Sequence, residues 1–102
     1  MTLNNFIQSA LNNFMHDVLN NIKENTTCYI ESGTVNQNHL HILAYRSDIS
    51  IKIDCYVHLT PKGASVHFFV DCPITGTKEH QWESSTDELN SENLAADIGC
   101  YL

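Results

Sequence analysis

Two alternating runs of apolar residues near the middle of the chain constrain its fold more than any other feature. In residues 49–59 and 64–72, apolar side chains occupy every second position. A period of two places alternate side chains on one face of a strand, so both runs are predicted to be half-buried antiparallel strands. A proline and a glycine in residues 60–63 suit a tight turn. The sequence therefore predicts a β-hairpin in which Leu59 lies opposite Ala64.

The register of this hairpin also determines its second face. It places Tyr56 opposite His67, and Lys52 opposite Asp71 as a cross-strand ion pair. We expect this outer face to be polar with aromatic side chains, and open to solvent unless a partner covers it.

The N-terminal part of the chain is predicted to supply a helix and two more strands. Apolar residues at offsets of three and four indicate an amphipathic helix over residues 2–23, capped by Thr2, that covers the apolar face of the sheet. Strands are expected over residues 27–32 and 39–45, separated by a polar turn at 33–38. The strands after this turn would form a meander with the central hairpin.

The C-terminal part is predicted to add a short edge strand over residues 78–82 and a second helix. Ser85 and Glu88 have the spacing of a capping box, and Gly99 is suited to the helix end. The expected fold is α+β, a single domain over residues 1–102. It consists of an antiparallel four- to five-stranded β-meander with the N-terminal amphipathic helix packed on one face and a short C-terminal helix.

The charge distribution limits the partners that the chain is expected to bind. The 12 acidic residues outnumber the 5 lysines and arginines, which gives a formal net charge of −7. No basic residue follows Lys78, while six acidic residues do. This balance argues against direct binding of a nucleic-acid backbone and favours a basic protein partner. Neither a secretory signal nor a membrane-spanning stretch is recognisable, so we expect a cytoplasmic protein with no membrane partner.

The cysteines are predicted to be structural. They are widely spaced, without a CxxC pair, at Cys28, Cys55, Cys72 and Cys100. Three of them have inward positions in the predicted elements. Buried free thiols are therefore favoured over disulfides or a zinc site.

Histidines are the strongest candidates for metal chemistry. Four of them have outward positions on the predicted sheet: His39, His41, His58 and His67. The i, i+2 spacing of His39 and His41 is usable for metal ligation, and Asp54 shares their face. However, Lys52 is expected near His41, where it would repel a cation. A solvated or partner-facing surface is the favoured interpretation, and metal binding by these histidines stays open.

No arrangement for catalysis is recognisable. A cysteine nucleophile needs an exposed, activated thiolate, whereas Cys55 and Cys72 are predicted to point into the core. No nucleophile elbow, phosphate-binding glycine loop or HExxH motif occurs. We therefore expect a protein that is not an enzyme and needs no cofactor.

Aromatic residues of the outer face and acidic residues of the C-terminal part are the predicted binding residues. Tyrosine and phenylalanine are enriched in the cores of protein interfaces. The predicted partner-binding residues are Tyr45, Lys52, Tyr56, His67, Phe69, Glu79, Glu83 and Glu92. They favour an acidic inhibitor of a basic, nucleic-acid-handling protein, of the anti-CRISPR or toxin-immunity type and encoded by a phage or mobile element. Homodimerisation through part of the N-terminal apolar stripe is an alternative use of that helix.

A second functional hypothesis comes from the first 60 residues. Besides the N-terminal amphipathic helix, two segments carry it: Tyr29-Ile30-Glu31-Ser32-Gly33-Thr34-Val35 and Ala44-Tyr45-Arg46-Ser47-Asp48-Ile49-Ser50-Ile51. This part of the chain resembles the tail completion proteins of P2-like phages, in which a short strand with an acid and a glycine precedes two further strands. The chain departs from that family after the third strand, where the family has a further helix. The resemblance implies a structural role in a phage tail.

Overall fold

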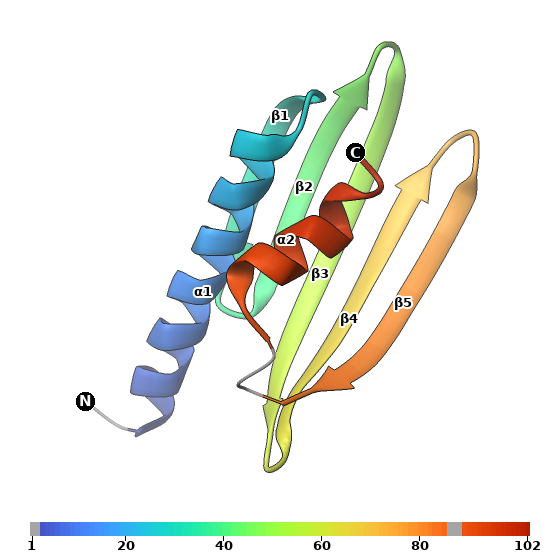
Figure 1. Cartoon of the computed structure of the whole chain (residues 1–102). Coiled ribbons are helices and arrows are strands. Elements are labelled where there is room, and N and C mark those ends of the chain that lie inside the picture. The colour runs from blue at the N-terminus through green and yellow to red at the C-terminus, as the bar shows by residue number, and fades with distance from the viewer. Residues whose placement is uncertain (1–2, 86–88) are drawn as a thin grey trace.

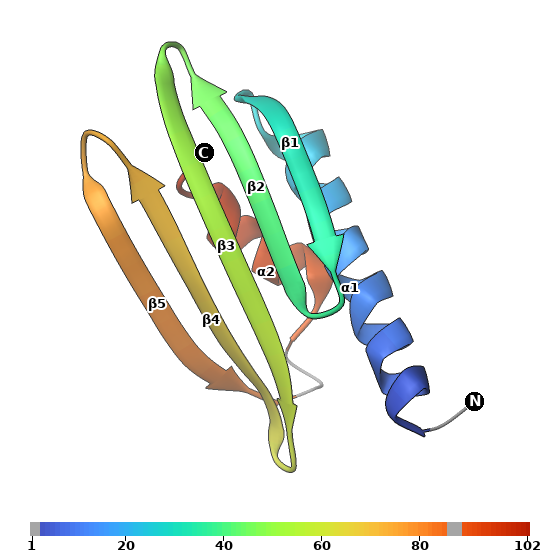
Figure 2. The same ribbon diagram turned by 180° about the vertical axis from the view of Figure 1, so that it is seen from behind.

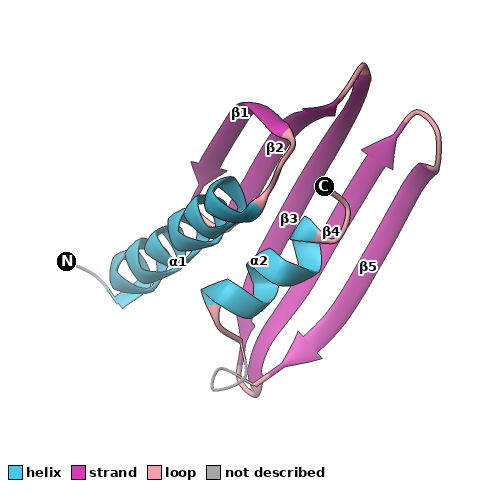
Figure 3. Ribbon diagram, turned by 45° about the horizontal axis from the view of Figure 1, so that its top comes forward, coloured by secondary structure: helices cyan, strands magenta, loops and turns pink. Residues whose placement is uncertain are grey.

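Five antiparallel strands and two helices make up the part of the chain that the computed structural model describes, residues 3–85 and 89–102, with side chains from residue 9 onward. The elements are α1 (Leu3–Asn25), β1 (Tyr29–Asn36), β2 (His39–Arg46), β3 (Ile49–Thr60), β4 (Gly63–Cys72), β5 (Gly76–Ser84) and α2 (Ser91–Gly99). The strands form one sheet in chain order. Both helices lie on the same face of it (Figures 1 and 3), which confirms the predicted α+β meander with a helix at each end.

The hydrophobic core lies between this sheet face and the two helices. Residues of the alternating pattern in β2, β3 and β4 meet one stripe of α1 and the inner side of α2. The buried apolar residues are Met15, Val18, Leu19, Ile22, Leu40, Ile42, Ala44, Ile51, Ile53, Cys55, Val57, Ala64, Val66, Phe68, Val70, Leu94, Ala95, Ile98 and Leu102. The N-terminal helix therefore covers the apolar face of the sheet, as its 3–4 periodicity predicts. The predicted cap, Thr2, lies outside the described residues.

The central hairpin has the predicted register. Leu59 lies opposite Ala64, and Lys52 lies opposite Asp71. The ion pairs in the described part of the chain are all between histidines and carboxylates, so the predicted Lys52–Asp71 ion pair does not form. Both side chains are exposed. Hydration of two exposed charges competes effectively with such a pair.

The first strand ends later than predicted, because Gly33 lies within the strand and not in the turn. The sequence predicts a strand over residues 27–32 and a turn at 33–38, but β1 continues to Asn36 and the chain turns at Gln37, where φ is 57°. A Cβ atom on Gly33 would lie 2.7 Å from Cδ1 of Leu19 in α1. Gly33 therefore allows the close approach of helix and strand, and it does not form a turn.

Strand β5 forms one edge of the sheet and exceeds the predicted residues 78–82 at both ends. Its helix-side position at His80 lies opposite Phe68, with ring centroids 4.8 Å apart. The hydroxyl of Tyr101 lies 2.5 Å from Nε2 of His80. The C-terminal residues therefore cover this polar position at the edge of the core.

The second helix begins later than the capping-box pattern predicts. Its N-cap is Asn90, whose side-chain oxygen accepts a hydrogen bond of 2.8 Å from the backbone N–H three residues later. Ser85 precedes the helix, and residues 86–88 lie outside the described part. The helix ends at Gly99, as predicted, but the chain continues in a right-handed conformation through Cys100 at φ −59°. Gly99 is therefore not a left-handed C-terminal cap.

Candidate functional site

The sheet face opposite the helices, the outer face, carries most of the predicted binding residues. No described helix covers it (Figure 2). Strand pairing places its central side chains in two adjacent rows: His39, Tyr56, His67 and Gln81 in one, and His41, Asp54, Phe69 and Glu79 in the other. The outer face therefore combines aromatic, imidazole and carboxylate groups along β2 to β5.

A cluster of His39, His41 and Asp54, the histidine–aspartate cluster, lies on β2 and β3 within this face. Nε2 of His39 lies 2.8 Å from Oδ1 of Asp54, and Nδ1 of His41 lies 2.9 Å from the same oxygen. Partial burial raises the pKa of Asp54, but hydrogen bonding and charge from His41 and His39 outweigh it, so the net pKa is lowered. The two imidazoles thus hold the carboxylate in its ionised form.

Lys52 lies one row away from the histidine–aspartate cluster. It pairs with Leu43, whereas His41 pairs with Asp54. Rows on one face of a strand are roughly 7 Å apart, and the Lys52 side chain is exposed. The cation that was expected near His41 therefore has room to point its ammonium group into solvent.

Aromatic contacts connect this cluster to the rest of the outer face. The ring of Tyr56 stacks on His39, with centroids 4.4 Å apart and an interplanar angle of 3°. On the next strand, His67 packs against Phe69 at 4.4 Å, and its Nε2 lies 2.5 Å from Oε1 of Glu79. The predicted binding residues Tyr56, His67, Phe69 and Glu79 therefore form one continuous surface.

The remaining predicted residues lie at the edges of this surface or outside it. Tyr45 lies on β2 beside Glu31, whose hydrogen bond and charge, with some desolvation, raise the pKa of the phenol. Glu83 lies on β5 opposite Ser65, on the outer face. Glu92 lies on α2, on the helix side of the sheet. The structure therefore brings Glu79 and Glu83 to one surface and separates Glu92 from them.

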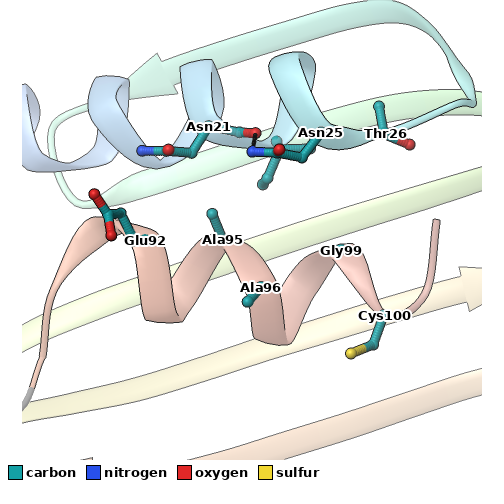
Figure 4. Close-up of a pocket in the computed structure, with 9 residues that line it drawn as sticks. Asn21, Asn25, Thr26, Glu92, Ala95, Ala96, Gly99 and Cys100 are labelled. Carbon is teal, nitrogen blue, oxygen red and sulfur yellow. Dashed lines mark hydrogen bonds between the residues drawn. The ribbon is translucent and has the colours of Figure 1, made fainter.

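Glu92 lines a groove between α1 and α2. The groove has a volume of about 480 Å³ and is lined by Asn21, Ile22, Asn25, Thr26, Glu92, Ala95, Ala96, Gly99 and Cys100 (Figure 4). Its titratable lining residues, Glu92 and Cys100, lie at opposite ends of α2, roughly 12 Å apart along the helix axis. Among the lining residues, no acid and base lie close enough to transfer a proton between them.

The four cysteines are free but differ in burial. Cys55 is fully buried, and desolvation raises the pKa of its thiol to about 12. Cys72 is only half-buried, and hydrogen bonds from the backbone of Thr75 and Ile74 help to lower its pKa. The predicted burial is therefore correct for Cys55, whereas Cys72 lies at the end of its strand and is partly accessible.

Comparison of the chain with protein-family models, curated protein sequences and solved structures returned no match. Within the described residues, no helix is both long enough and apolar enough to cross a membrane.

Proposed function

We propose that this protein is a non-catalytic binding module that uses the outer face to bind a basic, nucleic-acid-handling protein in the cytoplasm and inhibits it. The observation that supports this proposal is the continuous surface of Tyr56, His67, Phe69 and Glu79 on a sheet face that no described helix covers. Half-buried aromatic groups with a polar surround are typical of the central part of a protein interface. A phage or mobile-element inhibitor of the anti-CRISPR or toxin-immunity type has this chemistry.

The acidic residues give the proposal its electrostatic part. Glu79 and Glu83 project from β5 on the outer face, next to the aromatic rows. The chain as a whole has a net charge of −7. Carboxylates at the margin of an aromatic surface can occupy the positions where a nucleic-acid-binding protein expects phosphates. Such charges act mainly on the rate of association.

The experiment first identifies the partner and then measures its binding. The immobilised chain captures proteins from a host lysate, and the captured nucleic-acid-handling protein is purified for kinetic measurement. Tyr56→Ala is expected to weaken binding while cooperative unfolding is retained. Glu79→Gln with Glu83→Gln is expected to slow association at low salt and to flatten its salt dependence. Glu92→Gln, on the opposite side of the sheet, is the matched control and should change neither.

Two results would contradict the inhibitor proposal. The first is equal association rates at low salt for the double Gln variant and the unchanged chain. The second is a captured partner whose nucleic-acid-directed activity is the same with and without a saturating amount of this protein.

A role as a structural component of a phage tail is the alternative. The observation in its favour is that β1 and β5 are both edge strands, so each has a row of backbone groups without a neighbouring strand in the described fold. Such edges can pair with further copies or with another tail protein. Light scattering after gel filtration separates the two proposals, because a tail component would form larger assemblies with itself, whereas an inhibitor would bind its target as a discrete complex.

A further inference from the structure

We propose that the histidine–aspartate cluster binds one divalent first-row transition-metal ion, such as Zn²⁺, on the outer face. His39, His41 and Asp54 each offer a ligand atom, and these atoms lie within 4.8 Å of one another. Among the described residues, this is the one group of three or more potential metal ligands whose ligand atoms lie this close together. The proposal is separate from the partner-binding function, because it concerns the metal alone.

Two of the three distances between ligand atoms in the cluster are close to those that a metal ion requires. Ligands at about 2.1 Å from one ion lie roughly 3.0–3.4 Å apart for angles between a right angle and the tetrahedral angle. The two nitrogen-to-oxygen distances are 2.8 and 2.9 Å. Insertion of an ion therefore needs the two nitrogen-to-oxygen distances to grow by a few tenths of an ångström. It also needs the two imidazole nitrogens, which lie within 4.8 Å of each other, to approach to about 3.4 Å.

The imidazoles can present lone pairs to the ion without becoming charged. A neutral histidine carries its proton on one ring nitrogen and a lone pair on the other. In the metal-free protein, Nε2 of His39 and Nδ1 of His41 donate their protons in hydrogen bonds to the ionised Asp54. Metal binding moves each proton, by exchange with solvent, to the other ring nitrogen, so that the lone pairs of Nε2 and Nδ1 respectively face the metal. In the metal-free protein, the hydrogen bonds to Asp54 hold the same two nitrogens in nearly the same places. The stacking of Tyr56 on His39 further restricts the first ring.

The donor set selects the class of metal. Two imidazole nitrogens and one carboxylate oxygen suit zinc, copper, nickel or iron, whereas calcium and magnesium prefer sites made entirely of oxygen ligands. The three side chains are 30%, 35% and 36% exposed, so an ion can reach them from solvent. Three protein ligands leave at least one coordination position for water or another ligand.

Titration of the full chain with Zn²⁺ alone, followed by isothermal calorimetry, tests the proposal. The double variant Cys72→Ser with Cys100→Ser serves as the background, because an accessible thiol would also bind zinc. We expect one ion per chain, with affinity at least about tenfold lower in His41→Gln and in Asp54→Asn. His58→Gln is the matched control, since this exposed histidine shares the outer face but lies outside the cluster, and its variant should bind as before.

Cobalt provides a second measurement on the same variants. Co²⁺ bound by nitrogen and oxygen ligands should give visible absorption without a thiolate-to-cobalt charge-transfer band, and Zn²⁺ should displace it. Circular dichroism is used to check that each variant is folded. Asp54→Asn keeps the shape of the side chain and serves as the test if His41→Gln does not fold. The proposal is overturned if no ion binds, if His58→Gln weakens binding as much as His41→Gln, or if Asp54→Asn binds zinc as tightly as the unchanged chain.

Discussion

The reactivity of the cysteines provides the sharpest test of the sheet register. Cys55 is 0% exposed, and burial raises the pKa of its thiol from 9.0 to about 12. The thiolate is the reactive form, so at pH 8 the reactive fraction falls from roughly 10% to roughly 0.01%. Cys100, by contrast, is exposed. We expect Cys55 to react at least about 1,000-fold more slowly than Cys100, before the barrier to reagent entry is added.

Timed alkylation with iodoacetamide at pH 8, quenched and mapped by peptide mass spectrometry, measures all four rates at once. In concentrated urea Cys55 and Cys100 should react at similar rates, which controls for intrinsic reactivity. Cys72 should react on the timescale of Cys100, because it is half-buried and its pKa is lowered. Rapid native labelling of Cys55 would refute the register, since a slip of one residue is what would turn this side chain to the outer face.

Three further changes test the core, a turn and a helix cap. Ile53→Ala should destabilise the fold by about 2–5 kcal/mol in urea unfolding, because the side chain is fully buried, whereas Leu59→Ala, at 49% exposure, should have a much smaller effect. Gly63→Ala should lower the melting temperature strongly, because φ is +151° and a Cβ atom would lie 2.3 Å from a β5 carbonyl oxygen. Gly99→Ala is its control and should be neutral or stabilising, because a Cβ atom there would have no neighbour within 4 Å. Asn90→Ala should cost about 1 kcal/mol in the same unfolding assay, because the cap of α2 is lost.

The fold was predictable where a periodic pattern and a tight turn agree. In the central hairpin, period-two alternation gives the buried face and the Pro-Gly turn gives the register, and both are confirmed. The predicted bounds of β1 and α2 were wrong where a residue type that is typical of a turn or a helix cap has another role in the structure. Glycine is typical of turns, but Gly33 lies within β1 and makes room for the side chain of Leu19. Ser85 has the spacing of a capping box, but the N-cap of α2 is Asn90. Periodicity does not report such tertiary contacts.

The sequence predicted which sheet face carries the candidate site, but not which residues of neighbouring strands lie opposite each other in it. Parity alone places His39 and His41 outward, but their cross-strand partners depend on the length and position of the turn between β2 and β3. The turn consists of two residues, with Ser47 at φ 56°, so Arg46 pairs with Ile49 and the register brings His41 opposite Asp54. A shift of this register by two residues would instead place His41 opposite Lys52. The position of the turn therefore decides whether His41 faces a carboxylate or the lysine that the sequence suggested.

The separation of the two sheet faces makes the proposed functions testable without unfolding the protein. Ile53 and its inward neighbours make the core contacts, while Tyr56 projects to the outer face and contacts His39 there. Removal of the Tyr56 ring forfeits an aromatic contact of about 0.5–1.5 kcal/mol, against about 2–5 kcal/mol for Ile53→Ala. A loss of metal or partner binding in an outer-face variant that still unfolds cooperatively therefore reports on the site, because the core that stabilises the sheet lies on its other side.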